Sequence, residues 1–408
     1  MNVLVLNCGS SSLKYQLFRM PEEKVLIRGG IEKIGSDDAQ HFYKAEGQDG
    51  QGSHEGTSTS EILDHREALR QVLHVVTRES GVLQSVNEIS AVGHRVVHGG
   101  EQFALSTFLT DEVKHAIRDN VELAPLHNPA NLQGIEAMED VLPGVKQVAV
   151  FDTAFHQSMP PEHYLYPIPY VLYKRHKVRR YGFHGTSHRY VSSRVPFLVH
   201  RDLMNLKVIS CHIGNGASVT AIQNGRSIDT SMGMTPLEGV MMGTRSGDID
   251  PSIQGYVTAK EELTQEDFAS MLNKHSGLFG ISGLSGDMRK ITEARAKGSA
   301  RSALAFDMYE YRIRKYIGAY VAAMNGVDVL LFTAGVGENS PLLRRKICDH
   351  LTYLGLEIDV QANDTGKGER IISTSASRVT VCVIPTNEEL MIARDTQLLV
   401  SGLESWGK

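Results

Sequence analysis

The stretch VLVLNCGSSSLKYQL (Val3–Leu17) decides how the rest of the sequence is interpreted. An aliphatic run ends at Asn7, and a second apolar alternation resumes at Leu13 after one glycine and three serines. This pattern predicts two strands joined by a tight turn. Gly9 allows a close backbone approach, and the serine hydroxyls and Lys14 add donors, so the turn could cradle an anion. The alternative is a hairpin turn that binds nothing.

Two later stretches resemble this one. KVISCHIGNGASVTAI (207–222) again places an aliphatic run, a glycine and small polar residues before a second apolar strand, and aligns Gly214 with Gly9. VDVLLFTAGVGENSP (327–341) predicts a buried strand, a Gly-rich loop and a helix with Ser340 as N-cap and Pro341 in its first turn. The sequence therefore predicts two related halves, each with a strand–turn–strand whose backbone N–H groups could bind an anion. No Walker A loop or complete dinucleotide fingerprint occurs.

Composition excludes several classes of protein. The 408 residues suggest two domains, and a net charge of −5 argues against general affinity for nucleic acid or an anionic membrane. The basic run KRHKVRR (174–180) predicts a solvated face or loop rim. Four scattered cysteines favour reduced thiols over a disulfide framework or a zinc site. We see no signal peptide and no apolar stretch long enough to span a bilayer, and expect a cytoplasmic protein.

Strand-like and helix-like patterns alternate, which indicates an α/β architecture. We predict a helix after His65 that ends at Gly81, and one capped by Thr264 that stops at Gly277. A long helix from about 301 to 324 places Leu304 with the other apolar residues on its packed faces. The polar stretch 45–60 is interpreted as a surface loop.

Charged residues gather at predicted strand ends and in Gly-flanked loops. Arg95 lies in or just after a strand, Asp152 ends another, and Arg245 lies in a glycine-rich loop. Asp152 and Arg245 could form a structural ion pair, but arginines also suit phosphate and carboxylate. His184 and His188 have the spacing of a metal pair, yet Gly185 and Thr186 between them favour a loop. Together with the phosphate-cradle turns, these residues indicate phosphoryl transfer from a nucleotide to a small anion.

The sequence strongly resembles the acetate kinase family over essentially its whole length. Specific motifs carry the resemblance: LNCGSSSLK, GHRVVHGGE, APLHNPANL, VFDTAFH, RRYGFHGTSHRYV, CHIGNGASV, DTSMGMTPLEGVMMGTRSGDIDP, GDMRKI, TAGVGENS and TNEEL. It implies a duplicated ribonuclease H-like βββαβα core of the actin-like ATPase superfamily, in two lobes with a central cleft. We expect an N-terminal lobe of residues 1–154 plus 390–408 and a C-terminal lobe of residues 155–389.

The resemblance also implies roles for individual residues. Near Mg²⁺ it places Asn7 and Glu388. Nucleotide-binding positions are Ser10, Ser12, Lys14, His212, Ile213, Gly214, Asn215, Gly216, Asp287, Met288, Arg289, Gly335, Val336, Gly337, Glu338 and Asn339. Substrate-binding positions are Arg95, Val97, Leu126, Phe183 and Pro236. Catalytic positions are Asp152, His184, Asn215 and Arg245. Because a carboxylate acceptor is already ionised, we expect Asp152 to orient Arg245 or the metal shell rather than to transfer a proton.

The resemblance implies reversible, direct in-line transfer of a phosphoryl group from ATP to acetate with Mg²⁺, or with Mn²⁺ in its place. We expect a homodimer that binds neither nucleic acid nor membrane. Two alternatives stay open. One is a propionate kinase, because one methylene gives only about 1–3 kcal/mol of discrimination. The other is a nucleotide-driven switch or chaperone-type ATPase on the same fold.

Overall fold

The computed structural model describes residues 1–46, 53–125 and 127–403. The chain divides into two compact units, Met1–Ala154 with Asn387–Lys408, and Phe155–Thr386. Residue 390, where we expected the chain to return to the first lobe, lies inside helix α15 (Glu388–Val400). Among the described residues, no helix combines the length and the apolar character needed to cross a lipid bilayer.

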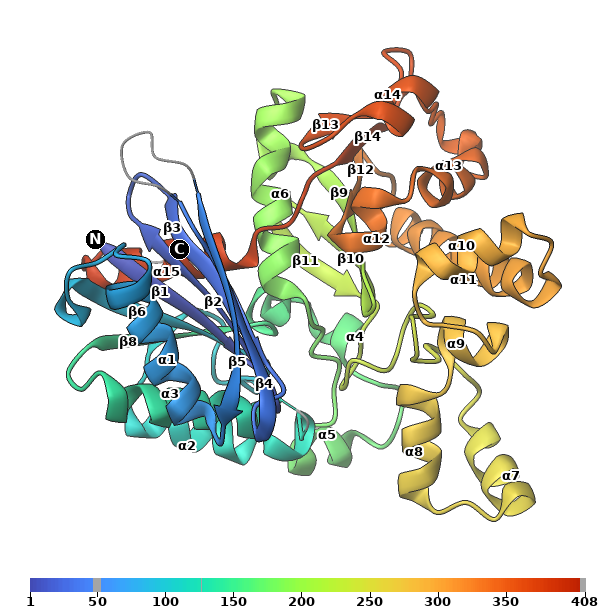
Figure 1. Ribbon diagram of the computed structural model, residues 1–408. Coiled ribbons are helices and arrows are strands. Elements are labelled where there is room, and N and C mark those ends of the chain that lie inside the picture. Colours follow the sequence, from blue (N-terminus) through green and yellow to red (C-terminus); the bar gives the residue numbers. More distant parts are fainter. Residues whose placement is uncertain (47–52, 126, 404–408) are drawn as a thin grey trace. The chain divides into compact units, whose positions relative to one another are not determined.

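The first unit is built on a mixed sheet of strand order β5-β4-β3-β2-β1-β6-β8-β7. Its strands are β1 (Asn2–Cys8), β2 (Ser12–Arg19), β3 (Lys24–Glu32), β4 (Ser36–Ala45), β5 (His54–Ile62), β6 (Ile89–Val96), β7 (Thr107–Phe108) and β8 (Lys146–Phe151). Its helices are α1 (His65–His74), α2 (Asp111–Asp119), α3 (Asn128–Val141) and α15. Helices α1 and α3 lie on one face of the sheet and α15 on the other (Figure 1).

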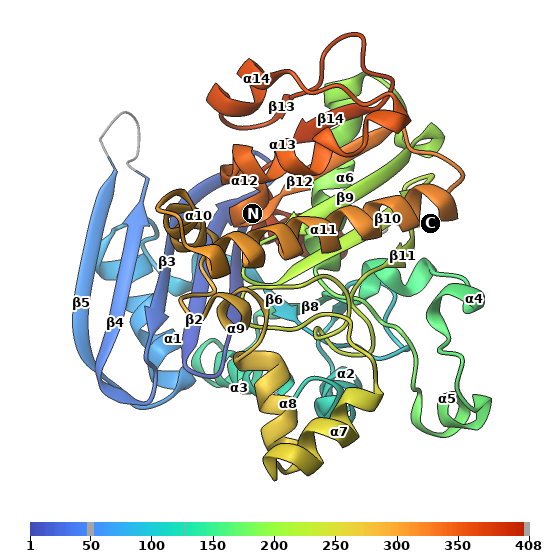
Figure 2. The same ribbon diagram turned by 90° about the vertical axis from the view of Figure 1, so that its right-hand side faces the viewer.

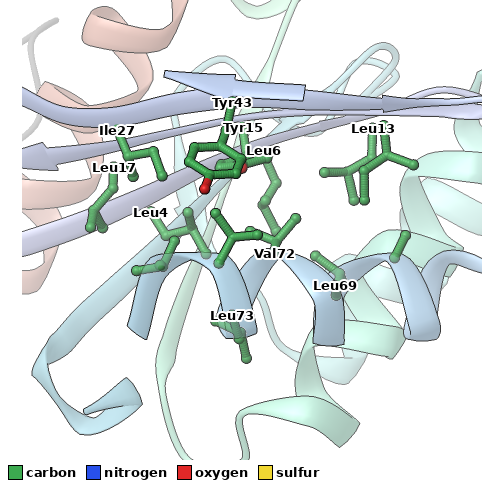
Figure 3. Close-up of a cluster of buried hydrophobic side chains, with 14 of the residues drawn as sticks. Leu4, Leu6, Leu13, Tyr15, Leu17, Ile27, Tyr43, Leu69, Val72 and Leu73 are labelled. Atoms are coloured by element: carbon green, nitrogen blue, oxygen red, sulfur yellow. The ribbon is translucent and has the colours of Figure 1, made fainter. Parts of the chain in front are cut away.

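Strand alternation and helix periodicity meet in the core of this unit. Leu13 and Leu17 of β2 point toward α1, where Leu69 and Val72 complete the cluster (Figure 3). The predicted helix after His65 is confirmed, and it continues beyond His74 as a π-helical turn over Val75–Glu79. Period-two and period-3.6 patterns thus bury one face of each element against the other.

The second unit contains a sheet of strand order β11-β10-β9-β12-β14-β13. Its strands are β9 (Lys207–Ile213), β10 (Ala217–Gln223), β11 (Arg226–Thr230), β12 (Val329–Thr333), β13 (Arg370–Ile371) and β14 (Thr380–Val383). Its helices are α4 (Pro161–Tyr164), α5 (Tyr170–His176), α6 (Gly185–Val199), α7 (Ser252–Glu261), α8 (Gln265–Lys274), α9 (Gly277–Ser282), α10 (Met288–Ala296), α11 (Ala300–Ala323), α12 (Ala334–Asn339), α13 (Pro341–Asp349) and α14 (Val360–Thr365). Helix α11 crosses the β9–β10 face, and α6 packs against β9 (Figure 2).

The two sheets repeat one topology. In the first unit β1 pairs antiparallel with β2 and parallel with β6. In the second, β9 pairs antiparallel with β10 and parallel with β12. The turns at Gly9 and Gly214 therefore occupy equivalent places. The α/β fold with a duplicated core is confirmed.

Several local predictions are wrong. Residues 54–60 belong to strand β5 rather than to a loop, because this polar segment pairs with β4 at the edge of the sheet, where its side chains meet solvent. The helix capped by Thr264 ends at Lys274, and Gly277 instead begins α9 with a positive φ. Leu304 is exposed, since the buried stripe of α11 runs through Phe306, Ile313 and Ile317.

Candidate active site

The turn between β1 and β2 is closed by a backbone hydrogen bond and anchored by a side chain at the start of α1. The Gly9 N–H donates to the Ser12 carbonyl at 2.8 Å, and Nε2 of His65 donates to the Gly9 carbonyl at 2.8 Å. Lys14 faces Asn7 across the two strands, and both Ser10 and Lys14 are exposed. The hydroxyls and the ammonium group are thus presented at a fixed turn.

Asn131, which the sequence analysis missed, ties this turn to the end of β6. Its side-chain amide donates to the Cys8 carbonyl at 2.8 Å, and its Oδ1 accepts from the Val97 N–H at 3.0 Å. Asn128 binds both backbone groups of His98, accepting from its N–H and donating to its carbonyl. Both asparagines lie in the APLHNPANL motif, so a pair of amides three residues apart was the available signal.

Arg95 lies in β6 and gathers oxygen atoms from three elements. Its Nε donates to Oδ2 of Asp152 at 3.0 Å, its Nη2 contacts the same oxygen, and its Nη1 donates to Oδ1 of Asn7 at 3.4 Å. Burial alone would lower the pKa of Arg95, but the carboxylates of Asp152 and Glu388 raise it above its ordinary value. Within the first unit Asp152 thus forms an ion pair with Arg95. That Asp152 orients Arg245 or the metal shell stays a prediction.

Glu388 completes this group from the start of α15, with Oε2 3.9 Å from Nε of Arg95. Burial raises the pKa of Glu388 to about 7, Arg95 opposes the rise, and Asp152 adds to it. The carboxylate therefore lacks full charge compensation. Mg²⁺ commonly uses one or two protein oxygens and takes the others from water and phosphate. The oxygens of Asn7 and Glu388 fit that requirement. Within the described residues no cluster of three or more His, Cys, Asp or Glu side chains forms a metal site.

In the second unit the β9–β10 turn is closed by the Gly214 N–H, which donates to the Gly216 carbonyl at 3.0 Å. A side chain at Gly216 would place its Cβ 3.3 Å from Nη1 of Arg245 and 3.5 Å from Nε2 of His184. The imidazole of His184 stacks on His212 with ring centroids 4.1 Å apart. The side chain of Asn215, in the same turn, packs against Gly243. A Cβ added at Gly243 would lie 2.2 Å from Oδ1 of Asn215. One small volume is thus bordered by a guanidinium, an imidazole nitrogen and a bare glycine.

Arg245 lies in a long irregular segment between β11 and α7. Its Nη1 donates to the Pro236 carbonyl at 3.4 Å and approaches Sδ of Met242 at 3.8 Å. Burial lowers the pKa of Arg245. No carboxylate within the described part of this unit forms an ion pair with it, so its charge is available for an anionic ligand.

Arg180 holds this irregular segment, so the prediction that the basic run is a solvated face or loop rim is wrong at this position. Its Nη1 donates to the carbonyls of Thr230 and Ser231, and its Nη2 donates to Oε1 of Glu238 at 2.7 Å. Tyr166 donates to the other oxygen of Glu238. Arg180 can reach them because it is part-buried beneath the segment, unlike the exposed Lys174 at the end of α5.

A pocket of about 1110 Å³ adjoins the second turn. Its lining includes many predicted nucleotide-binding positions, namely Gly214, Asn215, Asp287, Met288, Arg289, Gly335, Val336 and Asn339. Asp287 caps α10 by accepting from the Arg289 N–H at 2.9 Å, and it also binds the Arg289 guanidinium. The structure thus brings these positions together around one cavity.

The segment Gly335–Asn339 is helical (α12) and not the predicted loop, although Ser340 caps α13 as expected. Arg344, which the sequence analysis missed, explains the helix. From α13 its Nη1 donates to the carbonyls of Gly337 and Glu338, both at 2.8 Å. Its Nε and Nη2 donate to Asn363. The buried guanidinium satisfies carbonyls at the end of a short, glycine-containing helix.

His184 and His188 are not in a loop. His184 is the N-cap of α6, with φ of +56°, and His188 lies one turn into that helix. Gly185 and Thr186 are tolerated in the first turn because both are buried against the unit. The neighbouring Phe183 is also buried, and its carbonyl accepts from Nε2 of His156 at 2.9 Å.

The predicted positions are therefore divided between the units. Asn7, Arg95, Val97, Asp152 and Glu388 belong to the first unit, together with Ser10, Ser12 and Lys14. The remaining predicted positions belong to the second, except that Leu126 lies outside the described residues.

Residues 2–394 match the model of the acetokinase family. A protein named acetate kinase from Symbiobacterium thermophilum is 55% identical over 401 residues, covering 98% of this chain and 99% of the relative. The crystal structure of Porphyromonas gingivalis acetate kinase is 48% identical with a TM-score of 0.91, covering 98% of this chain and 99% of that one. A propionate kinase structure from Francisella tularensis is 40% identical with a TM-score of 0.90, covering 99% of this chain and 100% of that one.

Proposed function

The chain belongs to the acetokinase family, and on that premise we propose that it transfers the γ-phosphoryl group of ATP to acetate, giving acetyl phosphate and ADP. The observation that carries the proposal is the small volume beside Gly216, which Arg245 and Nε2 of His184 border. The same turn contributes Gly214 and Asn215 to the pocket that Gly335 and Asn339 also line. A phosphoryl group there would meet a cation and a hydrogen-bond donor while its nucleotide occupies the cavity.

The proposed transfer is direct and in line. A carboxylate oxygen of acetate attacks the γ-phosphorus, the bond to the β,γ-bridging oxygen breaks, and ADP leaves with that electron pair. No proton has to move. Arg245, His184 and Asn215 would stabilise charge on the equatorial oxygens, which is the main contribution of protein groups to phosphoryl transfer.

The groups around Arg95 would position the acceptor and the nucleotide. Arg95 would bind the acetate carboxylate, and Asp152 would hold the guanidinium through Nε and Nη2. Asn7 and Glu388 would hold Mg²⁺, or Mn²⁺ in its place. When bound, the ion would neutralise charge on the nucleotide phosphates. The backbone of the first turn, with Ser10, Ser12 and Lys14, would bind phosphate oxygens.

Val97, Leu126, Phe183 and Pro236 would form the apolar pocket for the acetate methyl group. Propionate is the second candidate acceptor, favoured by the similarity to the Francisella tularensis propionate kinase structure. We further propose a homodimer in the cytoplasm.

The test is an initial-rate comparison of acetate, propionate and butyrate with MgATP, with acyl phosphate trapped as the hydroxamate. We expect the highest kcat/KM with acetate. A higher value with propionate would reassign the acceptor, and no acyl phosphate from any of the three would refute the proposal. Phosphate release without a carboxylate would support the switch-type ATPase instead.

A further inference from the structure

Helix α6 begins with two histidines on one face, and serines from the sheet join them. Oγ of Ser218, in β10, lies 2.9 Å from Nδ1 of His184 and 2.8 Å from Nε2 of His188. Oγ of Ser210, in β9, lies 2.9 Å from Nδ1 of His188. The result is a continuous chain of hydrogen bonds in the order His184, Ser218, His188, Ser210. The last three are fully buried.

The number of hydrogens in this chain is fixed. Burial, with His156 and His212 nearby, lowers the pKa of His188 well below its ordinary value, so its ring is neutral and carries one N–H. A neutral imidazole donates from one nitrogen and accepts at the other. Ser218 has one hydroxyl hydrogen and therefore donates to one of its two imidazole neighbours while it accepts from the other. Every donor along the chain must therefore point toward His184, or every donor must point toward Ser210.

The direction matters at His184. If Ser210 donates to Nδ1 of His188, then Nε2 of His188 donates to Ser218, and Ser218 donates to Nδ1 of His184. A neutral His184 then carries its hydrogen on Nε2, the atom that borders Gly216. In the opposite direction Nδ1 carries the hydrogen, and Nε2 presents a lone pair that would repel an anion.

We propose that Ser210, His188 and Ser218 are positioning residues that hold His184 in the Nε2–H tautomer when an anion lies beside Gly216 and Arg245. The anion is taken to be the transferring phosphoryl group, so this identification rests on the function proposed above. The relay supplies a hydrogen-bond donor without requiring His184 to be charged. The relay also explains why Ser210 and Ser218 place hydroxyl groups beside His188 of α6, in buried stretches of β9 and β10.

The experiment compares Ser218→Ala and Ser210→Ala with the matched control Ser192→Ala. Ser192 is buried in α6, and its hydroxyl donates to the Arg189 carbonyl of the same helix rather than to a histidine of the chain above. The tautomer of His184 is determined by nitrogen-15 NMR of histidine-labelled protein, with inorganic phosphate as the anion, and the His184 signals are assigned from their loss in His184→Gln. Turnover and the KM for ATP are measured in parallel.

We expect wild type and Ser192→Ala to show Nε2–H at His184 with phosphate bound, and both relay variants to show a mixture of tautomers. Ser218→Ala should lose about 10–100-fold in turnover, the loss that is typical when the partner that orients a metal-binding histidine is removed. Its KM for ATP should stay unchanged. Ser210→Ala should lose less, and because Ser210 does not contact His184, packing alone would not change that tautomer.

A His184 tautomer that is the same in wild type and both relay variants would overturn the relay, even if turnover falls. So would the Nδ1–H tautomer in wild type with phosphate. If wild type forms no acyl phosphate but the tautomer responds to both substitutions, the proposed function fails and the relay stands.

Discussion

Replacing Arg344 by lysine should loosen the end of α12 and weaken nucleotide binding. The guanidinium makes four hydrogen bonds of 2.8 Å, two to carbonyls of α12 and two to Asn363. A lysine ammonium is a point donor and cannot reproduce this planar arrangement, so at least two buried acceptors lose their partner. Each such loss costs about 1–3 kcal/mol, which gives about 2–6 kcal/mol for the variant.

Arg345→Lys is the matched control, because the neighbouring Arg345 is exposed and its Nε is 4.0 Å from Asp349. The free energy of unfolding is measured by denaturant titration followed by circular dichroism, and KM for ATP and kcat by initial rates. For Arg344→Lys we expect lower stability and a KM for ATP that rises more than kcat falls. The reasoning is refuted if Arg344→Lys and Arg345→Lys behave alike in both measurements.

Three further predictions follow from named contacts. Arg245→Ala should reduce kcat by about 10³–10⁵-fold with a smaller change in the KM for ATP, and Arg245→Lys should recover little of the lost kcat. Initial rates measure both variants, and full recovery of kcat with lysine would contradict the prediction. Arg95→Ala and Asp152→Asn remove the same ion pair, so the fold-loss of turnover in the double variant should be smaller than the product of the two single fold-losses. A double variant whose fold-loss equals that product would show independent roles. Burial lowers the pKa of His94 to about 4, so the unfolded chain binds more protons at this site than the folded chain below about pH 6.5. His94 should therefore lower the free energy of unfolding by about 2 kcal/mol between pH 7.5 and 5. Denaturant titrations of wild type and His94→Gln at both pH values measure this change, and an equal pH dependence in the two proteins would count against it.

The sequence was sufficient where short-range patterns determine structure. The aliphatic runs around Gly9 and Gly214 predicted both strand–turn–strand elements, and Thr264 and Ser340 were identified as N-caps from their local context. Asp152 was expected at the end of a strand and lies directly after β8. These features depend on residues within a few positions of one another, so periodicity and capping rules reach them.

The missed residues act over long sequence separations. Asn131 binds the carbonyl of Cys8, and Arg180 binds that of Thr230. No periodicity connects such a side chain to a distant backbone carbonyl, and a basic run is most often exposed. Helix α12 was missed for a related reason, since its glycines disfavour a helix until Arg344 satisfies its carbonyls.

The place of α15 in the chain has a consequence for synthesis on the ribosome. This helix packs against β1 and β6, and at Gly93 the strand backbone approaches it so closely that a Cβ would lie 2.6 Å from Ile392. Residues 1–154 leave the ribosome before the second unit, yet the part of their sheet that α15 covers stays exposed until residues 388–400 have been translated. The second unit is continuous and can complete its core earlier. The half that is made first should therefore be the last to finish folding, with an apolar surface that chaperones can bind while translation continues.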